Sequence, residues 1–525
     1  MKNFFEFAVL AVLACACDGS LLEPFSENVD VAGVETLLGH EMMVLGAKLE
    51  DPYTVANMTK ALASVYPTKA DRVSVPTTDY YVRFLPTGGK QLEVLEKKGL
   101  HLVDYPVDYE IIKDGDYYHD PEIEDGRITW QYAVVKKDFE FPVGIRYEIL
   151  DDCYLPENDT QTKAADIDWD MVEKESYRLT GNEKLIETAT KGGTAGTPKG
   201  RITIVDDKLG QTPAGVKGVR VSVNSFVKFD HAFTDDDGNY EMSKSFSSSV
   251  RYRLVFKNKK GFGIGFNLLL VPASTSALGK APATGLDVMI DKSSNRKLFS
   301  RCVVNNAGYE YYDSCTKNGV SMKTPPSNLR IWLFQNLGPS SSVMMQQGAF
   351  IDNGLIGRYL GEYTALVKIF LPDITLGLKG KEDYNEIYAA AIHEMAHASH
   401  FMQAGKEYWD KYIEFILSSY VTSGFVTYGI GTEVNHGYCE VGEMWAYYIQ
   451  TKMYQERYGE NVVFGTSYWF SPQILLNLDD RGIDRFKIFN AMTHDITDRD
   501  LFQKKLTSLY PESKSIINQA FGRYN

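Results

Sequence analysis

One stretch decides how the C-terminal part of the chain folds: it reads Tyr384-Asn-Glu-Ile-Tyr-Ala-Ala-Ala-Ile-His-Glu-Met-Ala-His-Ala-Ser-His-Phe-Met-Gln-Ala404. The stretch contains neither Gly nor Pro and is rich in Ala, so it predicts one helix that ends before Gly405. His393 and His397 lie four residues apart, and side chains at this spacing share one face of a helix. Two neutral imidazoles placed in this way can reach one Zn²⁺ ion at about 2.0–2.1 Å.

Glu394 follows the first histidine and completes an H-E-x-x-H motif. Its carboxylate would lie beside a metal held by the two histidines, where it can take a proton from a bound water. The chain has nine His in 525 residues, so the motif arises by chance about one time in a hundred. The alternative is an ordinary helix whose histidines pack in the core. The motif therefore favours a metal site with Glu394 as the catalytic base.

A third ligand must come from elsewhere. Metzincins carry Gly and His at the positions occupied here by His400 and Gln403, so that pattern is excluded. His400 shares the face of His393 and His397, but seven residues correspond to about 10.5 Å along a helix. We therefore assign His400 a hydrogen-bonding or structural role behind the ligands.

A second helix is predicted from the segment Cys439-Glu-Val-Gly-Glu-Met-Trp-Ala-Tyr-Tyr448, continuing to about Tyr458 before Gly459. Its Glu-x-x-Ala element, with an aromatic residue before the Ala, resembles the third-ligand helix of gluzincins, the thermolysin-like and aminopeptidase-like zincins. The chain departs from the aminopeptidase pattern because it lacks an Asn before the Glu and a Gly-x-Met-Glu-Asn stretch. Aminopeptidase specificity is therefore unsupported.

The resemblance implies one Zn²⁺ per chain, held by His393, His397 and Glu443. It also implies that zinc-activated water attacks a peptide carbonyl while Glu394 acts as general base. Glu440 lies one turn before Glu443, and it is the alternative ligand or an acceptor for an imidazole N–H.

Two further features of this region bear on substrate binding. A donor for the developing oxyanion is expected, and we prefer His436 among four neighbours in the sequence: His436, Tyr438, Tyr447 and Tyr448. The predicted strand Val367–Leu371 precedes the zinc helix, and it is either an edge strand that pairs with an extended peptide or a buried strand.

A different pattern occupies the middle of the chain. Residues 188–199 are a linker of small residues, and after it apolar residues recur with a period of two, which predicts a β-sandwich over residues 200–292. The order of its strands and the turn Phe233-Thr-Asp-Asp-Asp-Gly-Asn-Tyr240 resemble carboxypeptidase regulatory-like (transthyretin-like) domains, which implies an accessory module. For Asp235, Asp236 and Asp237 we prefer a hydrogen-bonded turn over a calcium site.

The N-terminal half predicts two further parts. Residues 18–75 look helical, with Thr54 capping a helix over Val55–Val65. Residues 76–187 are rich in Tyr and predict an α/β domain, with a helix over Asp166–Arg178 near its end. Within it, a strand from Asp79, a helix over Gln91–Lys98 and a strand over Leu100–Asp104 indicate a βαβ-like unit.

Residues 1–17 predict a lipoprotein signal peptide. The apolar run Phe7–Cys17 has 11 residues, too few for the roughly 20 that span a membrane. The segment Val12-Leu-Ala-Cys15 resembles a bacterial lipobox, with Cys15 as the lipidated residue and Cys17 as the competing site. The resemblance implies an exported protein anchored by lipid in the bacterial cell envelope, at the outer membrane or cell surface. A soluble secreted protein is the alternative.

Composition sets the remaining limits. At roughly 150 residues per domain, 525 residues predict three or four domains. The net charge of −14 is the wrong sign for neutralising phosphates, so nucleic acid is excluded as a partner. There is no Cys-x-x-Cys pair for a thiolate site. Cys302 and Cys315 could close a disulfide, with buried free thiols as the alternative.

These observations together predict a multidomain α+β protein with a mostly helical zincin-like domain and small sheet over residues 293–525. The predicted activity is zinc-dependent hydrolysis of a peptide or protein substrate. Two alternatives stay open: a surface binding lipoprotein whose zinc is structural, and a zinc hydrolase that cleaves a non-peptide bond. The oligomeric state is open as well.

Overall fold

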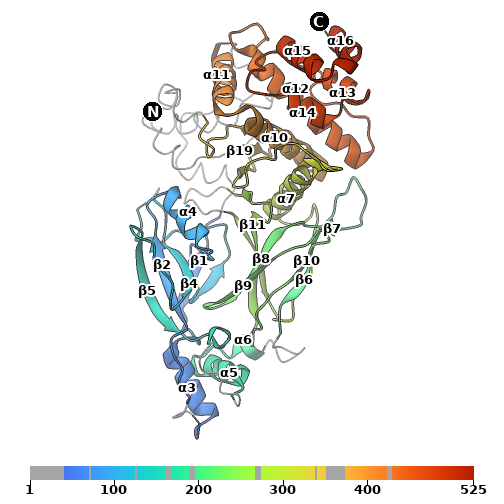
Figure 1. Ribbon diagram of the computed structural model, residues 1–525. Coiled ribbons are helices and arrows are strands. Elements are labelled where there is room, and N and C mark those ends of the chain that lie inside the picture. The colour runs from blue at the N-terminus through green and yellow to red at the C-terminus, as the bar shows by residue number, and fades with distance from the viewer. Residues whose placement is uncertain are drawn as a thin grey trace.

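The computed structural model describes residues 41–69, 73–124, 127–159, 167–187, 196–265, 273–336, 338, 340–349, 373–422 and 428–524. The protein is a mixed α/β molecule with several sheets (Figure 1). The signal segment with Cys15 and Cys17, most of the linker, and the expected strand Val367–Leu371 lie outside the described residues. None of the helices searched within these ranges has the length and apolar character needed to cross a membrane.

The N-terminal module contains two small antiparallel sheets. Strand β1 (Val44–Lys48) pairs with β3 (Tyr109–Lys113). Strand β2 (Asp79–Leu85) lies between β4 (Gln131–Lys136) and β5 (Arg146–Cys153) and is antiparallel to both. The expected βαβ-like unit is therefore wrong, because alternation of apolar residues predicts a strand but not its partner.

Three local predictions for this module can be compared with its elements. Helix α3 (Val55–Val65) begins after Thr54, whose side chain accepts the Asn57 N–H, as expected. Helices α4 (Gly89–Lys97) and α5 (Trp169–Leu179) also occupy expected positions. Two expectations are wrong: residues 18–75 are not uniformly helical, since β1 finds its partner far along the chain, and residues 100–104 contribute only a single bridge, Val103 to Tyr132.

Two sheets follow the linker, and their inward side chains share one core. The first contains β6 (Lys199–Ile204), β7 (Ala214–Gly215), β10 (Asn239–Glu241) and β14 (Val288–Ile290). The second contains β8 (Val219–Ser225), β9 (Lys228–Phe233), β11 (Val250–Asn258) and β13 (Thr275–Ala281). The expected period of two is confirmed: alternate residues such as Ile202, Val221 and Leu254 are fully buried in the shared core.

The turn before β10 is also as expected. Asp235 Oδ1 accepts the backbone N–H groups of Asp237 and Asn239 at 3.0 and 2.8 Å. These bonds are typical of Asp in a tight turn.

The second sheet continues into the C-terminal region. After β11 come β12 (Gly263–Ile264), β17 (Arg330–Phe334), β19 (Ile374–Gly377) and finally β18 (Ser341–Ser342). Strands β12, β17 and β19 are parallel to one another, and β18 is antiparallel to β19. One hydrogen-bonded sheet and one continuous core therefore connect the middle of the chain with the helices that follow.

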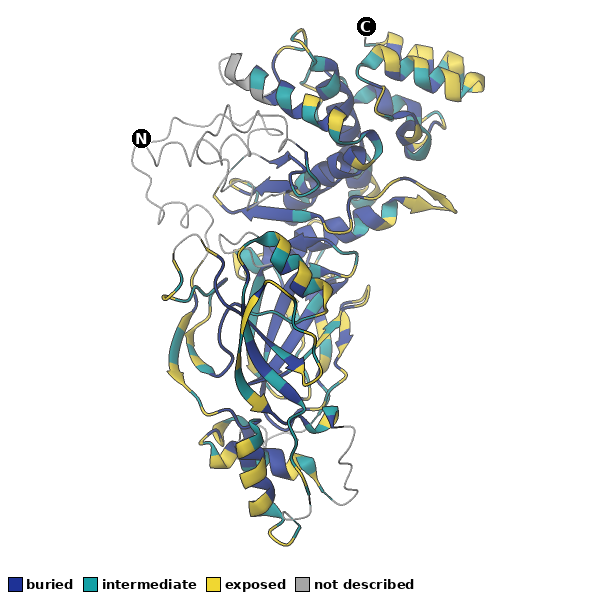
Figure 2. Cartoon of the chain, turned by 60° about the vertical axis from the view of Figure 1, so that its left-hand side comes forward, coloured by how far each residue is buried: buried dark blue, intermediate teal, exposed yellow. Residues whose placement is uncertain are grey.

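The C-terminal region is mostly helical. Its central helices are α7 (Arg296–Ser314), α10 (Tyr384–Ala404), α11 (Lys406–Thr422) and α12 (His436–Tyr458). The outer ones are α13 (Gln473–Asp479), α14 (Arg485–Ala491), α15 (Arg499–Leu509) and α16 (Lys514–Gly522). Helix α10 packs against α7, α11, α12 and the strands β18 and β19, so most of its side chains are buried (Figure 2).

Salt bridges join the N-terminal module to the rest of the molecule. Acidic residues of the module face basic residues of the long sheet and of α7, in the pairs Glu93–Arg330, Glu96–Lys257, Asp114–Arg251 and Asp116–Arg301. The acidic residues of the N-terminal module therefore hold the module against the long sheet and α7.

Of the two possibilities for Cys302 and Cys315, the structure shows free thiols. Cys302 lies in α7, Cys315 caps the C-terminal end of the same helix, and both are buried. Thirteen residues of helix separate them by about 20 Å, whereas a disulfide needs Cα atoms within about 7 Å. Burial raises the pKa of the Cys315 thiol to about 12, which keeps it protonated and unreactive.

Candidate metal centre

The H-E-x-x-H helix and the second predicted helix bring three side chains together. His393 and His397 on α10 meet Glu443 on α12, and their candidate ligand atoms all lie within 4.8 Å of one another. The two histidine Nε2 atoms are 3.2 Å apart. Glu443 Oε2 lies 3.4 Å from His393 Nε2, and Oε1 lies 3.5 Å from His397 Nε2. This buried His-His-Glu group could hold a metal ion.

The three separations can be compared with the geometry that a metal requires. Nitrogen and oxygen ligands about 2.0–2.2 Å from Zn²⁺ at tetrahedral angles lie about 3.3–3.6 Å from one another. The two Nε2 atoms, 3.2 Å apart, are close to this spacing. The two distances to Glu443 involve different carboxylate oxygens, Oε2 for His393 and Oε1 for His397, so the carboxylate spans the gap between the two imidazoles. Two imidazoles and one carboxylate are a donor set that suits zinc and other transition metals.

Specific contacts set the positions of the two helices. Helix α10 starts with a capping box, in which Asp383 and Glu386 satisfy each other's backbone N–H groups. The indole Nε1 of Trp445 on α12 donates to the carbonyl oxygen of Ala396 at 3.1 Å, one residue before His397.

Hydrogen bonds behind the cluster orient two of its members. His393 Nδ1 lies 3.1 Å from Gln450 Oε1, and a proton on Nδ1 leaves the Nε2 lone pair free to bind a metal. The Tyr412 hydroxyl donates to Glu443 Oε1 at 2.5 Å. His397 Nδ1 is buried and makes no hydrogen bond among the described residues.

Charge within the cluster opposes the effect of burial. Burial alone would raise the pKa of Glu443, but the neighbouring His397 and His393 lower it to about 2. Burial would likewise lower the pKa of His393, but its hydrogen bond and attraction to Glu443 raise it. The cluster thus presents an ionised carboxylate to any cation that it binds.

Glu394 is buried beside the cluster, and a residue outside the cluster holds its carboxylate by a hydrogen bond. The Ser342 hydroxyl on β18 donates to Glu394 Oε2 at 2.7 Å and lies 3.0 Å from its backbone oxygen. Burial raises the pKa of Glu394, against the lowering effects of His393 and His397. A carboxylate whose proton affinity is raised in this way is suited to accept and return a proton.

The other candidate residues lie apart from the three ligands. Glu440 pairs with Arg499 Nε at 3.2 Å. His400 packs against the rings of Tyr408 and Trp409, and burial, aided by His397, lowers its pKa to about 3. Neither ring nitrogen of His400 has a hydrogen-bond partner within the described ranges.

The four candidate oxyanion donors differ in their surroundings. His436 is the first residue of α12, and its Nδ1 lies 2.8 Å from the carbonyl oxygen of Glu433. The ring of Tyr447 lies 4.4 Å from the ring of His393. The Tyr438 carbonyl accepts from Tyr408, and the ring of Tyr448 packs against Trp445. The identity of the oxyanion donor stays a prediction.

Three supporting residues were not expected from the sequence: Ser342, Tyr412 and Gln450. The sequence could have indicated Gln450, because this residue lies seven positions after Glu443 and therefore on the same face of the helix. Ser342 and Tyr412 come from a two-residue strand and from a separate helix. No local pattern points to either of them.

Comparison of the chain with protein families, with curated proteins and with solved structures finds no significant match. The chemistry of this site must therefore be judged from its own geometry. That geometry supplies three metal-ligand side chains and an adjacent carboxylate with a raised pKa.

Proposed function

We propose that the protein is a zinc-dependent peptide hydrolase, an endopeptidase of the gluzincin type. The observation that carries the proposal is the convergence of His393, His397 and Glu443, whose candidate ligand atoms lie within 4.8 Å of one another, with Glu394 next to the first ligand. A metal site that serves stability alone needs no adjacent carboxylate, whereas hydrolysis needs a base.

Each side chain has a defined task in this proposal. Zn²⁺ would supply a Lewis acid that lowers the pKa of water and polarises a carbonyl. Glu394 removes a proton from the attacking water and returns it to the leaving amine. Ser342 holds the Glu394 carboxylate through Oε2, while Gln450 and Tyr412 hold His393 and Glu443 in orientation.

Strand β18 supports the catalytic carboxylate from behind. It runs along α10, and its Ser342 donates to Glu394. Ser341 and Ser342 are 0% and 2% exposed, and the Ser342 carbonyl oxygen accepts from Trp409 Nε1 at 2.9 Å. We therefore assign β18 a positioning role for Glu394.

The remaining parts of the chain have accessory roles in this proposal. Residues 293–525 form the zincin-like unit, and residues 200–292 are a carboxypeptidase regulatory-like sandwich that supports it through the shared sheet. The protein would be exported and held in the bacterial cell envelope by a lipid on Cys15 or Cys17. Its substrate would then be a peptide or protein of that compartment.

A second candidate function is supported by the burial of the site. His393, Glu394, His397 and Glu443 are 4%, 1%, 0% and 0% exposed. Such burial favours a binding protein whose metal is structural. The same centre could also hydrolyse a non-peptide bond, because the ligands determine the class of mechanism and not the substrate.

Metal analysis combined with a peptide-library cleavage assay tests the proposal. We expect about one zinc per chain and cleavage by the wild type. The variant Glu394→Gln should keep the zinc and lose cleavage by about 10²–10⁴-fold, the usual contribution of a general base. Glu407→Gln, on the exposed first turn of α11, is the matched control and should change neither quantity.

Three outcomes separate the candidates. A wild-type chain that binds no zinc after reconstitution would defeat all of them. Bound zinc that raises the melting temperature without cleavage of any peptide or ester would favour the structural site. Cleavage of esters but not of peptides would favour the non-peptide hydrolase.

A further inference from the structure

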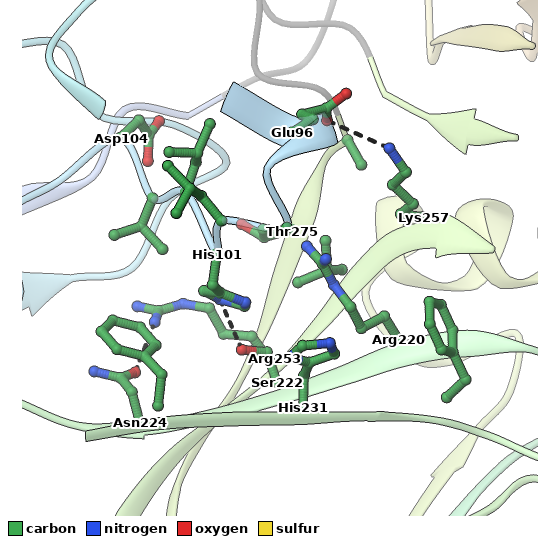
Figure 3. A pocket seen from close by; sticks show the side chains of 18 of the residues that line it. Glu96, His101, Asp104, Arg220, Ser222, Asn224, His231, Arg253, Lys257 and Thr275 are labelled. Atoms are coloured by element: carbon green, nitrogen blue, oxygen red, sulfur yellow. Dashed lines mark hydrogen bonds and ion pairs between the residues drawn. The ribbon is translucent and has the colours of Figure 1, made fainter. Parts of the chain in front are cut away.

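A cavity of 320 Å³ lies away from the metal centre, between the N-terminal module and the long sheet. Its floor is the outer face of β8, β9 and β11, and its roof is the segment 99–105 that follows α4. Figure 3 shows His101 of this roof reaching toward Ser222, His231 and Arg253 on the floor. The volume falls within the range of small-molecule sites, about 300–1,000 Å³.

The strands that form the floor of the cavity carry polar side chains on this face, although the N-terminal module covers it. Along β8, Val219, Val221 and Val223 point into the shared core, so the alternate residues Arg220, Ser222 and Asn224 point toward the cavity. Strand pairing places Ser222 opposite His231 on β9 and opposite Arg253 on β11. Arg220 lies diagonally from Arg253, at a separation of about 7–8 Å between positions.

Arg253 is a buried cation that lacks a close counter-ion. It is 5% exposed, and its Nη2 makes no hydrogen bond with any described residue. Its closest carboxylate oxygen is Asp114 Oδ1 at 4.0 Å, and this atom already accepts from Arg251 at 2.9 Å. The guanidinium lies over the ring of Tyr105 at 4.6 Å. Burying a charge in this way is costly unless something pairs with it.

Arg220, on the neighbouring strand β8, also lacks a close counter-ion among the described residues. Its Nε atom is buried and has no hydrogen-bond partner in the described part of the chain. Burial lowers the pKa of Arg220, and the charge of Glu96 opposes this effect. Glu96 is itself paired with Lys257 at 3.4 Å.

Asp104 attracts Arg253 at longer range, but neither Asp104 nor Asp116 forms an ion pair with Arg220 or Arg253 in the described structure. Asp116 binds Lys297 and Arg301 at 2.6 and 2.8 Å. Asp104 accepts the backbone N–H of Tyr118, and burial raises the pKa of its carboxyl to about 6. The cavity thus carries excess positive charge in a protein whose net charge is −14.

Flat side chains complete the lining. His101 Nε2 lies 3.0 Å from the Ser222 hydroxyl, and its ring packs near Phe229 and His231 at 5.1 and 5.7 Å. His101 Nδ1 is buried without a hydrogen-bond partner among the described residues. The cavity therefore offers ring faces together with unpaired N–H groups.

We propose that this cavity is a binding site for a small organic anion whose carboxylate or phosphate group is held by Arg220 and Arg253. The paired N–H groups of a guanidinium match the paired oxygens of a carboxylate or a phosphate. Hydrogen bonds between such charged groups are stronger than those between neutral groups. The rest of the ligand lies against the rings of His101, Phe229 and His231. The site joins two modules, so an occupant also fastens the N-terminal module to the sheet.

Isothermal titration calorimetry on the full chain tests this site with four probes: inorganic phosphate, succinate, glucuronate and neutral glucose. We expect at least one anion to bind and glucose not to bind. Phosphate binding alone would assign a phosphate ligand, and binding of the carboxylates alone would assign a carboxylate ligand. Arg220→Gln and Arg253→Gln should each weaken that binding about 10-fold or more, as expected for bonds to a charged group.

Two controls make the result specific. Arg201→Gln removes an exposed arginine from β6 in the other sheet, and it should change the affinity by less than about twofold. The double variant His393→Ala/His397→Ala removes the metal cluster and should leave anion binding intact. The inference is overturned if no anion binds more tightly than glucose, if both arginine variants bind as the wild type does, or if binding disappears with the metal cluster. Arg220 is the less buried of the two arginines, so its variant remains informative if Arg253→Gln does not fold.

Discussion

Two buried polar regions of this protein handle charge in different ways. In the helical region, Arg457 on α12 is paired with Asp206 and Glu310, each at 2.9 Å, and it lies over the rings of Tyr384 and Tyr388. In the cavity below the N-terminal module, Arg253 is more deeply buried, but its nearest carboxylate oxygen is 4.0 Å away.

The difference indicates what each region is built for. Paired charges within one core hold elements together, and here they join α12 to α7 and to the loop after β6. Unpaired charges around a cavity cost stability and are retained where a ligand compensates them. In the metal cluster the two imidazole Nε2 atoms lie 3.2 Å apart, so either one carries a proton and donates it to the other, or a bound cation takes both lone pairs.

The largest expected effect concerns the metal cluster. Glu443→Ala should lower zinc affinity by more than about 100-fold, since even residues that only support metal ligands contribute 10–100-fold. Competition with a fluorescent chelator measures the affinity directly. The matched control is Glu440→Ala on the same helix, where the carboxylate pairs with Arg499. Loss of zinc in Glu440→Ala and its retention in Glu443→Ala would reverse the assignment of the third ligand.

The next effect contrasts the two arginines in urea unfolding. Arg457→Met removes the cation that pairs with buried Asp206, while Glu310 keeps Lys217 at 3.2 Å, and the change should reduce the free energy of unfolding by about 3 kcal/mol. Arg253→Met removes a buried charge that lacks a close partner, so it should change the free energy of unfolding by less than about 1 kcal/mol or increase it.

The contrast is informative because both variants introduce the same side chain. Equal losses of stability in the two variants would mean that Arg253 is paired in solution, which would remove the basis for the anion site. A wild-type protein that gains stability from a bound anion, while Arg253→Met does not, would sharpen the contrast further.

The metal cluster could be predicted from the sequence, whereas the cavity could not. His393, Glu394 and His397 lie within five consecutive residues, and the spacing of a helix is enough to place them on one face. Glu443 was placed by the resemblance of its helix and not by spacing. The cavity combines residues from the 99–105 segment, three strands and β13. Arg220 and Arg253 look like ordinary polar residues on the solvent face of a strand, because nothing local shows that another module covers that face.

The same limit explains the errors in the N-terminal half. The helix over Val55–Val65 was predicted because its cap lies next to it in the sequence. Strand β1 was not predicted, because its partner β3 lies about 60 residues further along the chain. The state of Cys302 and Cys315 stayed open for the opposite reason: they are near in sequence, but a straight helix holds them apart.

The smallest expected effect is a pH dependence that originates in the cavity. Burial lowers the pKa of His101 well below its usual value, with further lowering by Arg220, His231 and Arg253. Above pH 6.5, His101 is neutral in both the folded and the unfolded chain. Below pH 6.5 the unfolded chain takes up a proton that the folded chain resists, so stability falls as the pH falls.

This contribution amounts to about 1.4 kcal/mol at one pH unit below 6.5. Urea unfolding at pH 7.5 and pH 5.5 should therefore show a smaller loss in His101→Gln than in the wild type, whereas exposed His494→Gln should behave as the wild type does. An anion held by Arg220 and Arg253 would offset their repulsion of a protonated His101, so saturating anion should reduce the loss in the wild type. An unchanged pH dependence in His101→Gln would contradict the buried position of this ring beneath the N-terminal module.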